Sequence, residues 1–287
     1  MKIKLLAFDS MGVRSAATVI EIRGLRVFID PGISYAPRRY GLPPHPLELK
    51  RLEELKRIIY EEASKADVIV ISHYHYDHYE PQADFYEGKI LMIKHPERDI
   101  NVSQRIRASV FLKNKFNLPE KIYYVDNSTF EIGNISLKFS PPVPHGPEGS
   151  KLGFVIMTLV DDGNYKVLHT SDTQGPISDR ATAIIERAKP NLVIDCGPPT
   201  YFEGFKIDSN SIEKAINNII KLLNMSSLEE LIIDHHTLRD LNYKQRLKRV
   251  FEKAERLEKK VLTAAEYMGK PIEQLEALRK QLWQNQR

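Results

Sequence analysis

The chain has 287 residues, of which 42% are hydrophobic and 28% are charged, a balance typical of a folded globular protein and not of a disordered one. No apolar run approaches the roughly 18 residues of a membrane-spanning helix, and the N-terminus shows no cleavage site, so the sequence predicts a cytoplasmic protein that does not bind membranes. The single cysteine, Cys196, excludes an internal disulfide and a cysteine-based zinc knuckle. We therefore expect any bound metal to be held by histidine and carboxylate.

The first third of the chain is rich in short β-type patterns. Three strands are expected at residues 3–8, 17–22 and 25–30, the last two joined by a hairpin-like turn. A proline-rich stretch without periodicity follows at 31–47 and predicts a long loop, which in a compact domain is usually functional or disordered. A helix at 49–63 then leads into a buried strand at 66–73, which ends in a dense group of polar residues.

The remaining sequence alternates strands and helices, and its last part is helical. The expected elements are strands at 89–95 and 121–126, a helix at 102–115, hairpins within 128–143 and 151–172, helices at 178–188 and 209–223, strands at 191–196 and 228–236, and helices from 242 onward. Two β-rich halves with outer helices predict an α+β fold with four layers, an αββα sandwich carrying a C-terminal helical extension. We place the main domain at 1–240 and the extension at 241–287, packed on the same domain.

The net charge of +4 is concentrated in the C-terminal tail. From Arg239 onward there are 13 Lys and Arg residues against 7 Asp and Glu residues, a surplus of 6, which leaves the first 238 residues at −2. This tail could contact nucleic acid, but its basic residues alternate with glutamate at helical spacing, which is more typical of a solvated helix face. Pairing of two subunits through the tail helices is a further interpretation.

Metal-binding side chains follow four of the expected strands. They are His73, His75, Asp77 and His78 in "SHYHYDH", His145 in "PPVPHGPEG", Asp172 in "HTSDTQG", and His235 and His236 in "IIDHHTLRD". Strands that end at one edge of a sheet deliver their following loops to the same surface, so these side chains are expected to converge. In an extended segment residues two apart point the same way, so His73 and His75 can bind one cation. Asp77 and His78 lie one turn further on and can face a neighbouring one.

With His145 on the first ion, Asp172 between the two ions and a histidine of the last loop on the second, each ion would keep a place for water. That pattern is typical of a catalytic site, whereas a structural zinc is closed by four protein ligands. Each residue also has a structural interpretation: His145 as a loop histidine, Asp172 as a helix N-cap. Four polar side chains directly after a buried strand cost free energy of folding unless they have a function, and this favours the metal site. His45, His95 and His169 are interpreted as structural.

These residues, in this order, resemble the metallo-β-lactamase superfamily. "RVFIDPG" is similar to an early strand of that superfamily that ends in aspartate and glycine, and "VLHTSDT" is similar to its "YTGDT" strand end. The resemblance covers residues 1 to 240 and leaves out the tail. It implies an αββα fold with one or two metal ions, commonly zinc and sometimes iron or manganese. The chain looks most like an archaeal branch of predicted metal-dependent hydrolases.

The resemblance also implies roles for individual residues. It implies that Asp30 lies behind the metal ligands. "DHHTLRD" is similar to the "THxxxRY" ending of the tRNA 3′-processing branch, which aligns His235 with the ligand and Arg239 with the arginine, although His236 remains an alternative. The sequence departs from the family where "YEPQ" replaces the pair of glycines that often follows the first motif.

The ligand set and the resemblance together imply a hydrolase, with two divalent transition-metal ions as cofactors, zinc favoured and iron or manganese as alternatives. A metal-activated water or hydroxide would attack, Asp77 would orient it and take its proton, and His235 would complete the second ion. We lean to a phosphoester or phosphodiester, as a small molecule or in nucleic acid, with Arg38, Arg39 and Arg239 as substrate-binding residues. Hydrolysis of a thioester, lactone or amide and a non-enzymatic metal-binding role are the alternatives.

Overall fold

The computed structural model describes residues 1–285 and divides the chain into two compact units. Of the described residues, unit 1 comprises 1–96, 103–124 and 264–285, and unit 2 comprises 97–102 and 125–263. Within the described residues, no helix has both the length and the apolar character needed to cross a membrane. The chain therefore leaves its first unit, builds the second and returns to the first at its C-terminus. The predicted boundary at residue 240 remains a prediction.

Unit 1 is built on a six-stranded sheet whose strands follow one another in chain order. The strands are β1 (Lys2–Phe8), β2 (Ala16–Ile22), β3 (Leu25–Ile29), β4 (Val68–Ile71), β5 (Ile90–Ile93) and β6 (Lys121–Tyr124). The first three pair antiparallel, and β3 to β6 pair parallel. Because β3 and β4 are parallel neighbours, the residues that follow them emerge at the same edge of the sheet.

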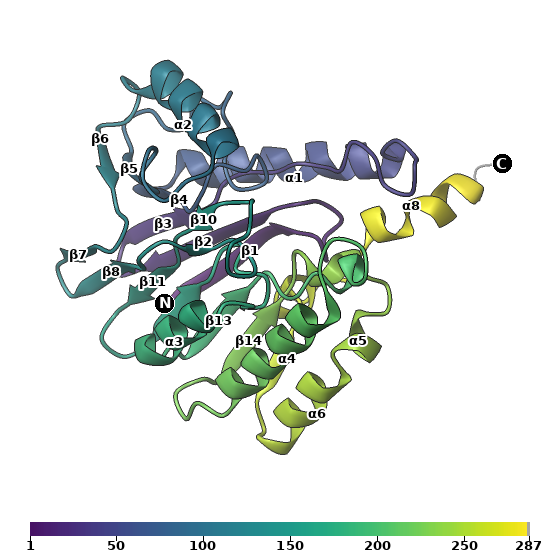
Figure 1. Cartoon of the computed structure of the whole chain (residues 1–287). Coiled ribbons are helices and arrows are strands. Elements are labelled where there is room, and N and C mark those ends of the chain that lie inside the picture. Colours follow the sequence, from purple (N-terminus) through teal and green to yellow (C-terminus); the bar gives the residue numbers. More distant parts are fainter. Residues whose placement is uncertain (286–287) are drawn as a thin grey trace. The chain divides into compact units, whose positions relative to one another are not determined.

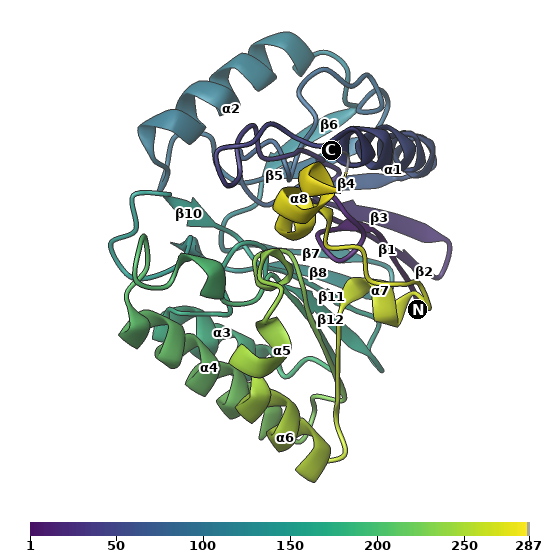
Figure 2. The same ribbon diagram turned by 90° about the vertical axis from the view of Figure 1, so that its right-hand side faces the viewer.

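The helices of unit 1 come from both ends of the chain. They are α1 (Pro46–Ser64), α2 (Val102–Lys115), α7 (Ala264–Tyr267) and α8 (Leu275–Gln284). Helix α1 begins three residues earlier than the sequence pattern predicts because Pro46 occupies its first turn and His45 caps it. Nδ1 of His45 accepts from the Leu47 amide at 3.2 Å, and Glu48 closes the capping box. Figures 1 and 2 both show α8 beside the beginning of α1.

Unit 2 is built on a seven-stranded sheet in the order β15-β14-β13-β12-β11-β8-β7. Its strands are β7 (Thr129–Ile132), β8 (Ile135–Phe139), β11 (Thr158–Asp161), β12 (Lys166–His169), β13 (Leu192–Asp195), β14 (Glu230–Ile233) and β15 (Lys260–Leu262), and a separate small sheet pairs β9 (Val143–Pro144) with β10 (Phe154–Val155). Strands β12, β13, β14 and β15 are parallel, so the segments that follow β12, β13 and β14 share one edge.

The helices of unit 2 are α3 (Asp179–Ala188), α4 (Ser209–Leu223), α5 (Tyr243–Arg246) and α6 (Lys248–Arg256), with short 3-10 turns η1 (Thr200–Phe202) and η2 (Thr237–Arg239). Isoleucines of α4, among them Ile212, Ile216 and Ile219, pack with Leu168, Val193 and Leu231 of the strands in one apolar core. Figure 1 shows α3, α4 and α6 side by side against this sheet. The core fixes the strand ends from which the polar segments emerge.

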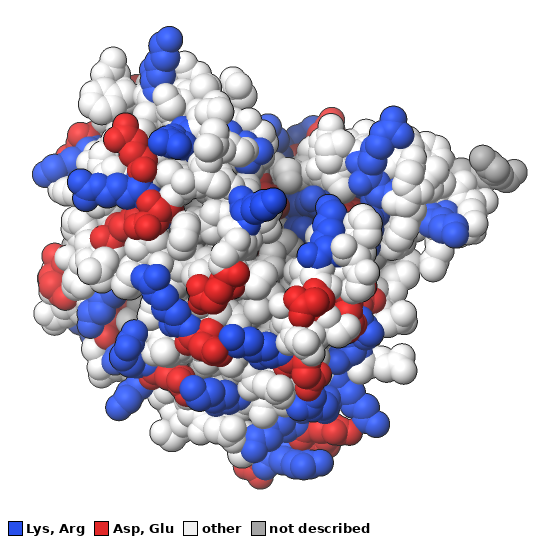
Figure 3. All heavy atoms as spheres, in the orientation of Figure 1, with Lys and Arg blue, Asp and Glu red and all other residues white. Residues whose placement is uncertain are grey.

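The C-terminal tail contains one strand that the sequence pattern did not predict. Residues 260–262, expected to be helical, form β15 and extend the sheet beside β14. The apolar pair Val261 and Leu262 is too short for a helical face but fits a parallel edge strand. Figure 3 shows side chains of both charge signs interspersed over the region of α6, where Arg249 pairs with Glu213 of α4. This pattern is that of a solvated helix face.

Candidate metal centre

The carboxylate of Asp30 organises the histidine motif of unit 1. Asp30 follows β3, Ser72 follows the neighbouring β4, and both residues are fully buried. Oδ1 of Asp30 accepts from the Ser72 amide at 2.8 Å, and Oδ2 accepts from the Ser72 hydroxyl at 2.6 Å and from Nδ1 of His78 at 2.7 Å. Three donors therefore converge on one buried carboxylate, which lies behind the histidine motif.

These contacts fix which nitrogen of each imidazole carries the proton. A carboxylate only accepts, so Nδ1 of His78 donates and Nε2 keeps its lone pair. The Ser72 hydroxyl donates to Asp30 and can accept at its oxygen from Nδ1 of His73, which lies 3.0 Å away. Nε2 of His73 then also keeps its lone pair, 3.0 Å from Nδ1 of His75. Neutral imidazoles with a free lone pair are the form that binds a metal ion.

The loop that carries these histidines is held from both sides by buried contacts. The Tyr74 amide donates to Oε1 of Gln104 on α2 at 3.1 Å, and the Tyr74 hydroxyl donates to the carbonyl of Lys94 at 2.6 Å. On the other side Gly32 packs directly on the motif backbone, because a Cβ added there would lie 2.1 Å from the Tyr79 nitrogen. The motif has little freedom to change its shape.

The segment that stands where the family often has glycines braces the motif. Tyr79 is buried with its ring 5.3 Å from that of Phe111 on α2. Oε2 of Glu80 lies 2.7 Å from Nζ of Lys56 on α1, while the Glu80 amide donates to the Tyr86 hydroxyl at 3.2 Å. These residues tie the end of the motif to helices α1 and α2. Asp77 is half-buried, with a carboxylate oxygen within 4.8 Å of a ring nitrogen of His78.

In unit 2, Asp172 lies among three imidazoles. Its Oδ2 lies 3.1 Å from Nε2 of His145 and 3.3 Å from Nε2 of His236, and its Oδ1 lies 3.5 Å from Nε2 of His235. All four side chains are at least nine-tenths buried. The structure therefore brings together the predicted ligands His145, Asp172 and His235, and it adds the alternative His236.

The turn that carries Asp172 depends on Asp195, which sequence reasoning missed. Asp195 ends β13 and accepts from the Thr170 hydroxyl at 2.8 Å, the Thr173 hydroxyl at 3.3 Å and the Gly197 amide at 2.6 Å. Burial raises the pKa of Asp195 to about 6, although these three hydrogen bonds act in the opposite direction. A signal existed in the sequence, because Asp30, Asp195 and Asp234 all follow an isoleucine at a strand end.

The predicted arginines are placed differently from one another. Arg239 is 3% exposed, and its Nη2 lies 3.0 Å from Nε2 of His235 while its Nη1 donates to Nδ1 of His236 at 3.2 Å. Arg39 belongs to the 31–47 loop of unit 1, where its Nε lies 3.9 Å from Glu276 of α8. Arg38 is exposed. Of these three arginines, the structure brings Arg239 next to predicted ligands of its own unit.

The backbone beside these donors adopts an unusual conformation. Positive φ angles occur at Asp30 (53°), Ser171 (55°), Gln174 (60°) and His235 (38°). Residues other than glycine take this left-handed conformation at a cost of roughly 1–2 kcal/mol each, and such residues gather at functional sites. The Asp30 amide is held there by the carbonyl of Val70 at 2.9 Å. The surrounding structure therefore enforces the positions of both donor sets.

The chemistry of both donor sets fits a divalent transition-metal ion. Imidazole nitrogens and carboxylate oxygens are the ligands that zinc, iron and manganese take in proteins. Burial lowers the pKa of His236 to about 3, so its ring is neutral at neutral pH. The same burial would make ionised carboxylates costly without a cation nearby. Each unit thus presents a set of preoriented, buried donors.

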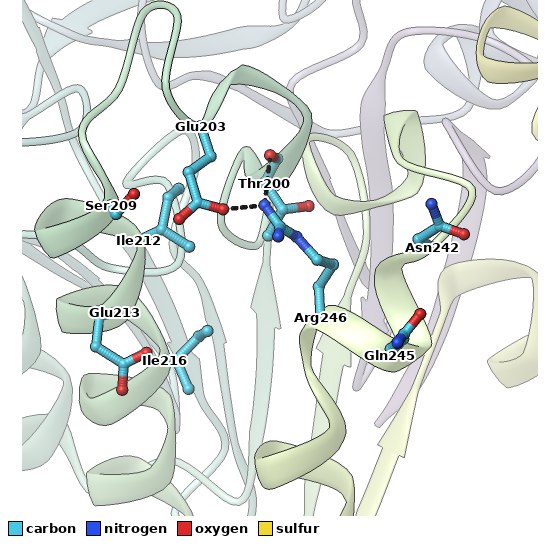
Figure 4. Close-up of a pocket in the computed structure, with 9 residues that line it drawn as sticks. All are labelled: Thr200, Glu203, Ser209, Ile212, Glu213, Ile216, Asn242, Gln245 and Arg246. Atoms are coloured by element: carbon cyan, nitrogen blue, oxygen red, sulfur yellow. Dashed lines mark hydrogen bonds and ion pairs between the residues drawn. The ribbon is translucent and has the colours of Figure 1, made fainter.

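A surface cavity of unit 2 lies apart from the predicted ligands. It has a volume of about 490 Å³ and is lined by Thr200, Glu203, Ser209, Ile212, Glu213, Ile216, Asn242, Gln245 and Arg246. Figure 4 shows the Arg246 guanidinium reaching across it to Glu203 and to the Thr200 carbonyl, which is 3.3 Å away. Thr200 in turn donates to Asp240 at 2.6 Å, just after η2. An internal ion pair thus closes part of this cavity.

Comparison with known proteins identifies the family. Residues 25–198 match the family model described as a beta-lactamase superfamily domain. The UPF0282 protein of Korarchaeum cryptofilum is 44% identical over 99% of this chain and 95% of its own length, and the UPF0282 protein of Methanopyrus kandleri is 41% identical over 98% and 99%. Sequence likeness therefore extends over the C-terminal tail as well as the matched domain.

Three solved structures share the fold at low sequence identity. An isothiocyanate hydrolase from Delia radicum gut bacteria has a TM-score of 0.57 at 15% identity over 92% of this chain and 95% of that one. YhfI from Bacillus subtilis, a metallo-β-lactamase fold protein, has a TM-score of 0.53 at 13% identity over 91% and 95%. A metal-dependent hydrolase of the β-lactamase superfamily has a TM-score of 0.52 at 17% identity over 91% and 94%. The predicted fold class is therefore confirmed, and the chain belongs to the β-lactamase superfamily, among the archaeal UPF0282 proteins.

Proposed function

We propose that this protein is a metal-dependent hydrolase whose histidine and aspartate donors bind divalent transition-metal cations, two in number and with zinc favoured. The observation that carries the proposal is the hydrogen bonding of Asp30, which contacts Nδ1 of His78 directly and is linked to Nδ1 of His73 through the Ser72 hydroxyl. A buried hydrogen-bonded carboxylate behind ligating histidines serves to orient metal ligands. Membership of a superfamily that includes metal-dependent hydrolases supports it.

We assign separate roles in hydrolysis to Asp77, His235 and Arg239. Cations bound at these donors would supply Lewis acidity and a water of lowered pKa. Asp77, half-buried beside His78, orients the attacking water and accepts its proton at a carboxylate oxygen. We assign His235 a place near the oxygen of a bound substrate. Arg239 donates toward that oxygen and supports the negative charge that develops there.

The substrate we favour is a phosphoester or phosphodiester. The guanidinium of Arg239 lies buried beside His235 and His236, and such a cation suits a bidentate phosphate oxyanion. Arg38 and Arg39, on the 31–47 loop, would bind the remainder of the substrate. An acyl substrate is the alternative, because Tyr35 and Tyr40 of the same loop are exposed and could form an apolar wall.

Metal analysis and a substrate screen test the proposal. Protein purified without chelator is expected to contain one to two transition-metal ions per chain by elemental analysis. Wild type is expected to hydrolyse bis-p-nitrophenyl phosphate faster than nitrophenyl esters or a thioester, and Asp77→Ala is expected to lose at least about 100-fold in kcat/KM, the scale of a lost general base. Asp84→Ala, which removes an exposed aspartate paired with Lys115, is the matched control.

The outcomes separate the three candidate functions. Hydrolysis of esters alone would favour the acyl alternative, and bound metal without any hydrolysis would favour a metal-binding role. Equal rates for wild type and Asp77→Ala would exclude the mechanism. A stable protein that takes up no metal would exclude the proposal as a whole.

A further inference from the structure

The only cysteine of the chain lies at the strand edge that carries Asp172. Cys196 directly follows β13 and is 5% exposed, between the segments that follow β12 and β14. Ligand atoms of Asp172, Cys196 and His236 all lie within 4.8 Å of one another, and all three side chains belong to unit 2. The expectation that histidine and carboxylate alone supply the ligands therefore overlooks a thiol that sequence spacing could not place.

The backbone segments around Sγ of Cys196 approach one another closely. The Gln174 amide donates to Sγ of Cys196 at 3.0 Å. Gly175 has a φ of +95°, and a Cβ there would lie 2.7 Å from the Pro198 nitrogen, so only glycine lets the turn after Asp172 close over the cysteine. Gly197 is equally constrained, because a Cβ there would lie 2.0 Å from Oγ1 of Thr237. These approaches hold the Asp172 and His236 segments on either side of Cys196.

His236 places a buried ring nitrogen near Asp172 and Cys196. Its side chain is 9% exposed, and among the described residues Nε2 makes no hydrogen bond of acceptable geometry, although Oδ2 of Asp172 lies 3.3 Å away. Its amide donates to the carbonyl of Cys196 at 2.8 Å, which fixes the two residues relative to each other. A buried imidazole nitrogen without a hydrogen bond costs free energy that a bound cation would recover.

We propose that Cys196 is a thiolate ligand, and that Asp172, Cys196 and His236 hold one thiophilic divalent cation of the zinc, cobalt or cadmium type. Imidazole nitrogen, carboxylate oxygen and thiolate sulfur together suit a tetrahedral borderline-soft ion. Manganese and magnesium, which prefer oxygen ligands, suit this site less well. The inference rests on the proposed metal-dependent function and deepens it by naming the metal class and His236 as the ligand from the last loop.

Protons must move when the cation binds. Burial and the carboxylates of Asp195 and Asp172 raise the pKa of the Cys196 thiol, so the metal-free protein carries the protonated form. Binding releases this proton to solvent, and the amide of Gln174 stabilises the thiolate that remains. Arg239 donates to Nδ1 of His236, so the ring proton must shift from Nε2 to Nδ1 as that hydrogen bond breaks. Arg239 retains its contact with the Tyr201 hydroxyl at 3.3 Å.

Cobalt substitution of the full-length protein tests the assignment. A thiolate ligand gives Co²⁺ an intense sulfur-to-metal charge-transfer absorption in the near ultraviolet, whereas nitrogen and oxygen ligands give only weak visible bands. Wild type is expected to show the charge-transfer absorption on titration with Co²⁺. Cys196→Ser is expected to lose it, to keep the visible bands and to bind Co²⁺ at least about tenfold more weakly. Serine preserves the acceptor for the Gln174 amide, so the variant should fold.

Two controls complete the comparison. His236→Asn is expected to weaken Co²⁺ binding by at least about tenfold, while His95→Asn, which removes a histidine that contacts Tyr124 in unit 1, is expected to leave the charge-transfer absorption unchanged. Should Cys196→Ser fold poorly, X-ray absorption of zinc-loaded wild type gives the answer alone. A sulfur neighbour at about 2.3 Å supports the proposal, and a shell of nitrogen and oxygen only overturns it.

The results distinguish this inference from the proposed hydrolase. Metal-dependent hydrolysis with visible Co²⁺ bands but no sulfur absorption would overturn the role of Cys196 and leave the hydrolase standing. Sulfur-to-cobalt absorption without hydrolysis of any substrate tested would support the role of Cys196 and overturn the proposed hydrolase. Failure of the protein to bind Co²⁺ or Zn²⁺ would overturn both.

Discussion

At the scale of single residues, three aspartates at the ends of buried strands hold the polar segments near the strand ends by hydrogen bonds. Asp30, Asp195 and Asp234 each accept a hydrogen bond from a backbone amide of a polar segment, at 2.8, 2.6 and 2.7 Å respectively. Each carboxylate is almost fully buried behind side chains that could bind metal. Because an ionised carboxylate only accepts, it fixes the direction of every donor around it. These residues turn strand ends into rigid supports for the donors.

Asp30→Asn tests this support. The amide group of asparagine donates where the carboxylate accepts, so one donor among Ser72 and His78 loses its partner. We expect metal affinity to fall by about 10–100-fold and the free energy of unfolding to fall by about 1–3 kcal/mol. Chelator competition and urea denaturation measure the two effects. Asp67→Asn, an exposed aspartate that accepts from the Arg26 amide, should leave metal affinity unchanged.

Gly32→Ala tests the contact between the 31–47 loop and the histidine motif. Its new Cβ would meet the Tyr79 nitrogen at 2.1 Å and the His78 carbonyl carbon at 2.4 Å, so the backbone must shift. We expect a loss of about 1–3 kcal/mol in stability together with weaker metal binding. Gly24→Ala serves for comparison, since it has a φ of +88° and open space around it. If both variants bound metal as wild type does, Gly32 would have no part in positioning His78.

At the scale of elements, helix α8 holds the 31–47 loop in place. Arg279 is fully buried and makes two hydrogen bonds of 2.7 Å to the Glu48 carboxylate, and it also donates to the carbonyls of Ala36 at 2.9 Å and Leu42 at 3.2 Å. The Trp283 indole donates to the Pro43 carbonyl at 3.1 Å. A loop rich in proline and tyrosine thus becomes ordered through a helix more than 230 positions later.

Arg279→Met is therefore expected to be strongly destabilising. Loss of the guanidinium leaves Glu48 as an uncompensated buried charge, at a cost of about 3–5 kcal/mol. The double variant Arg279→Met with Glu48→Met should recover part of that loss in urea denaturation, because no buried charge remains. Lys280→Met, at an exposed neighbouring position, should stay within about 0.5 kcal/mol of wild type. An Arg279→Met variant as stable as wild type would refute the role assigned to this ion pair.

At the scale of the whole molecule, the chain closes its first unit with its last residues. Residues 264–285 belong to unit 1. Within this unit the Ala265 amide donates to the Ser10 hydroxyl at 3.0 Å, and the Glu273 amide donates to the Ser10 carbonyl at 2.7 Å. Arg14 adds two hydrogen bonds to Glu276, of 2.5 and 2.7 Å. The first unit is therefore completed by a segment that follows unit 2 in the chain.

Ending the chain after Thr263 should loosen unit 1 selectively. Hydrogen exchange is expected to accelerate in the 31–47 loop and at the start of α1, because their buried partners on α8 are gone. Protection in β13 and α4 of unit 2 is expected to remain, since their apolar core contains no residue beyond 263. A chain ending after Gln284 keeps all of α8 and should exchange like wild type. Uniform loss of protection in both units would contradict this division.

The sequence by itself determined the fold class, most element positions and the histidine motif. Periodicity located α2 at 102–115 and α4 at 209–223 with the bounds that the structure has, and donor chemistry singled out His73, His75 and Asp172. These features are local, because they depend on the spacing of side chains within one segment. The start of α1 was missed because histidine is an uncommon cap, and β15 was missed because its strand identity comes from pairing with β14.

Tertiary structure alone decided the contacts between distant segments. Only the fold could place Asp30 against His78, Cys196 beside Asp172, and Arg279 against Glu48, because these partners are separated by 48, 24 and 231 positions and their pairing follows from strand order and helix packing. The sequence singled out side chains of the types that bind metal ions. The folded chain decided which nitrogens keep their lone pairs and which sulfur lies within reach, since both depend on hydrogen bonds made by buried neighbours.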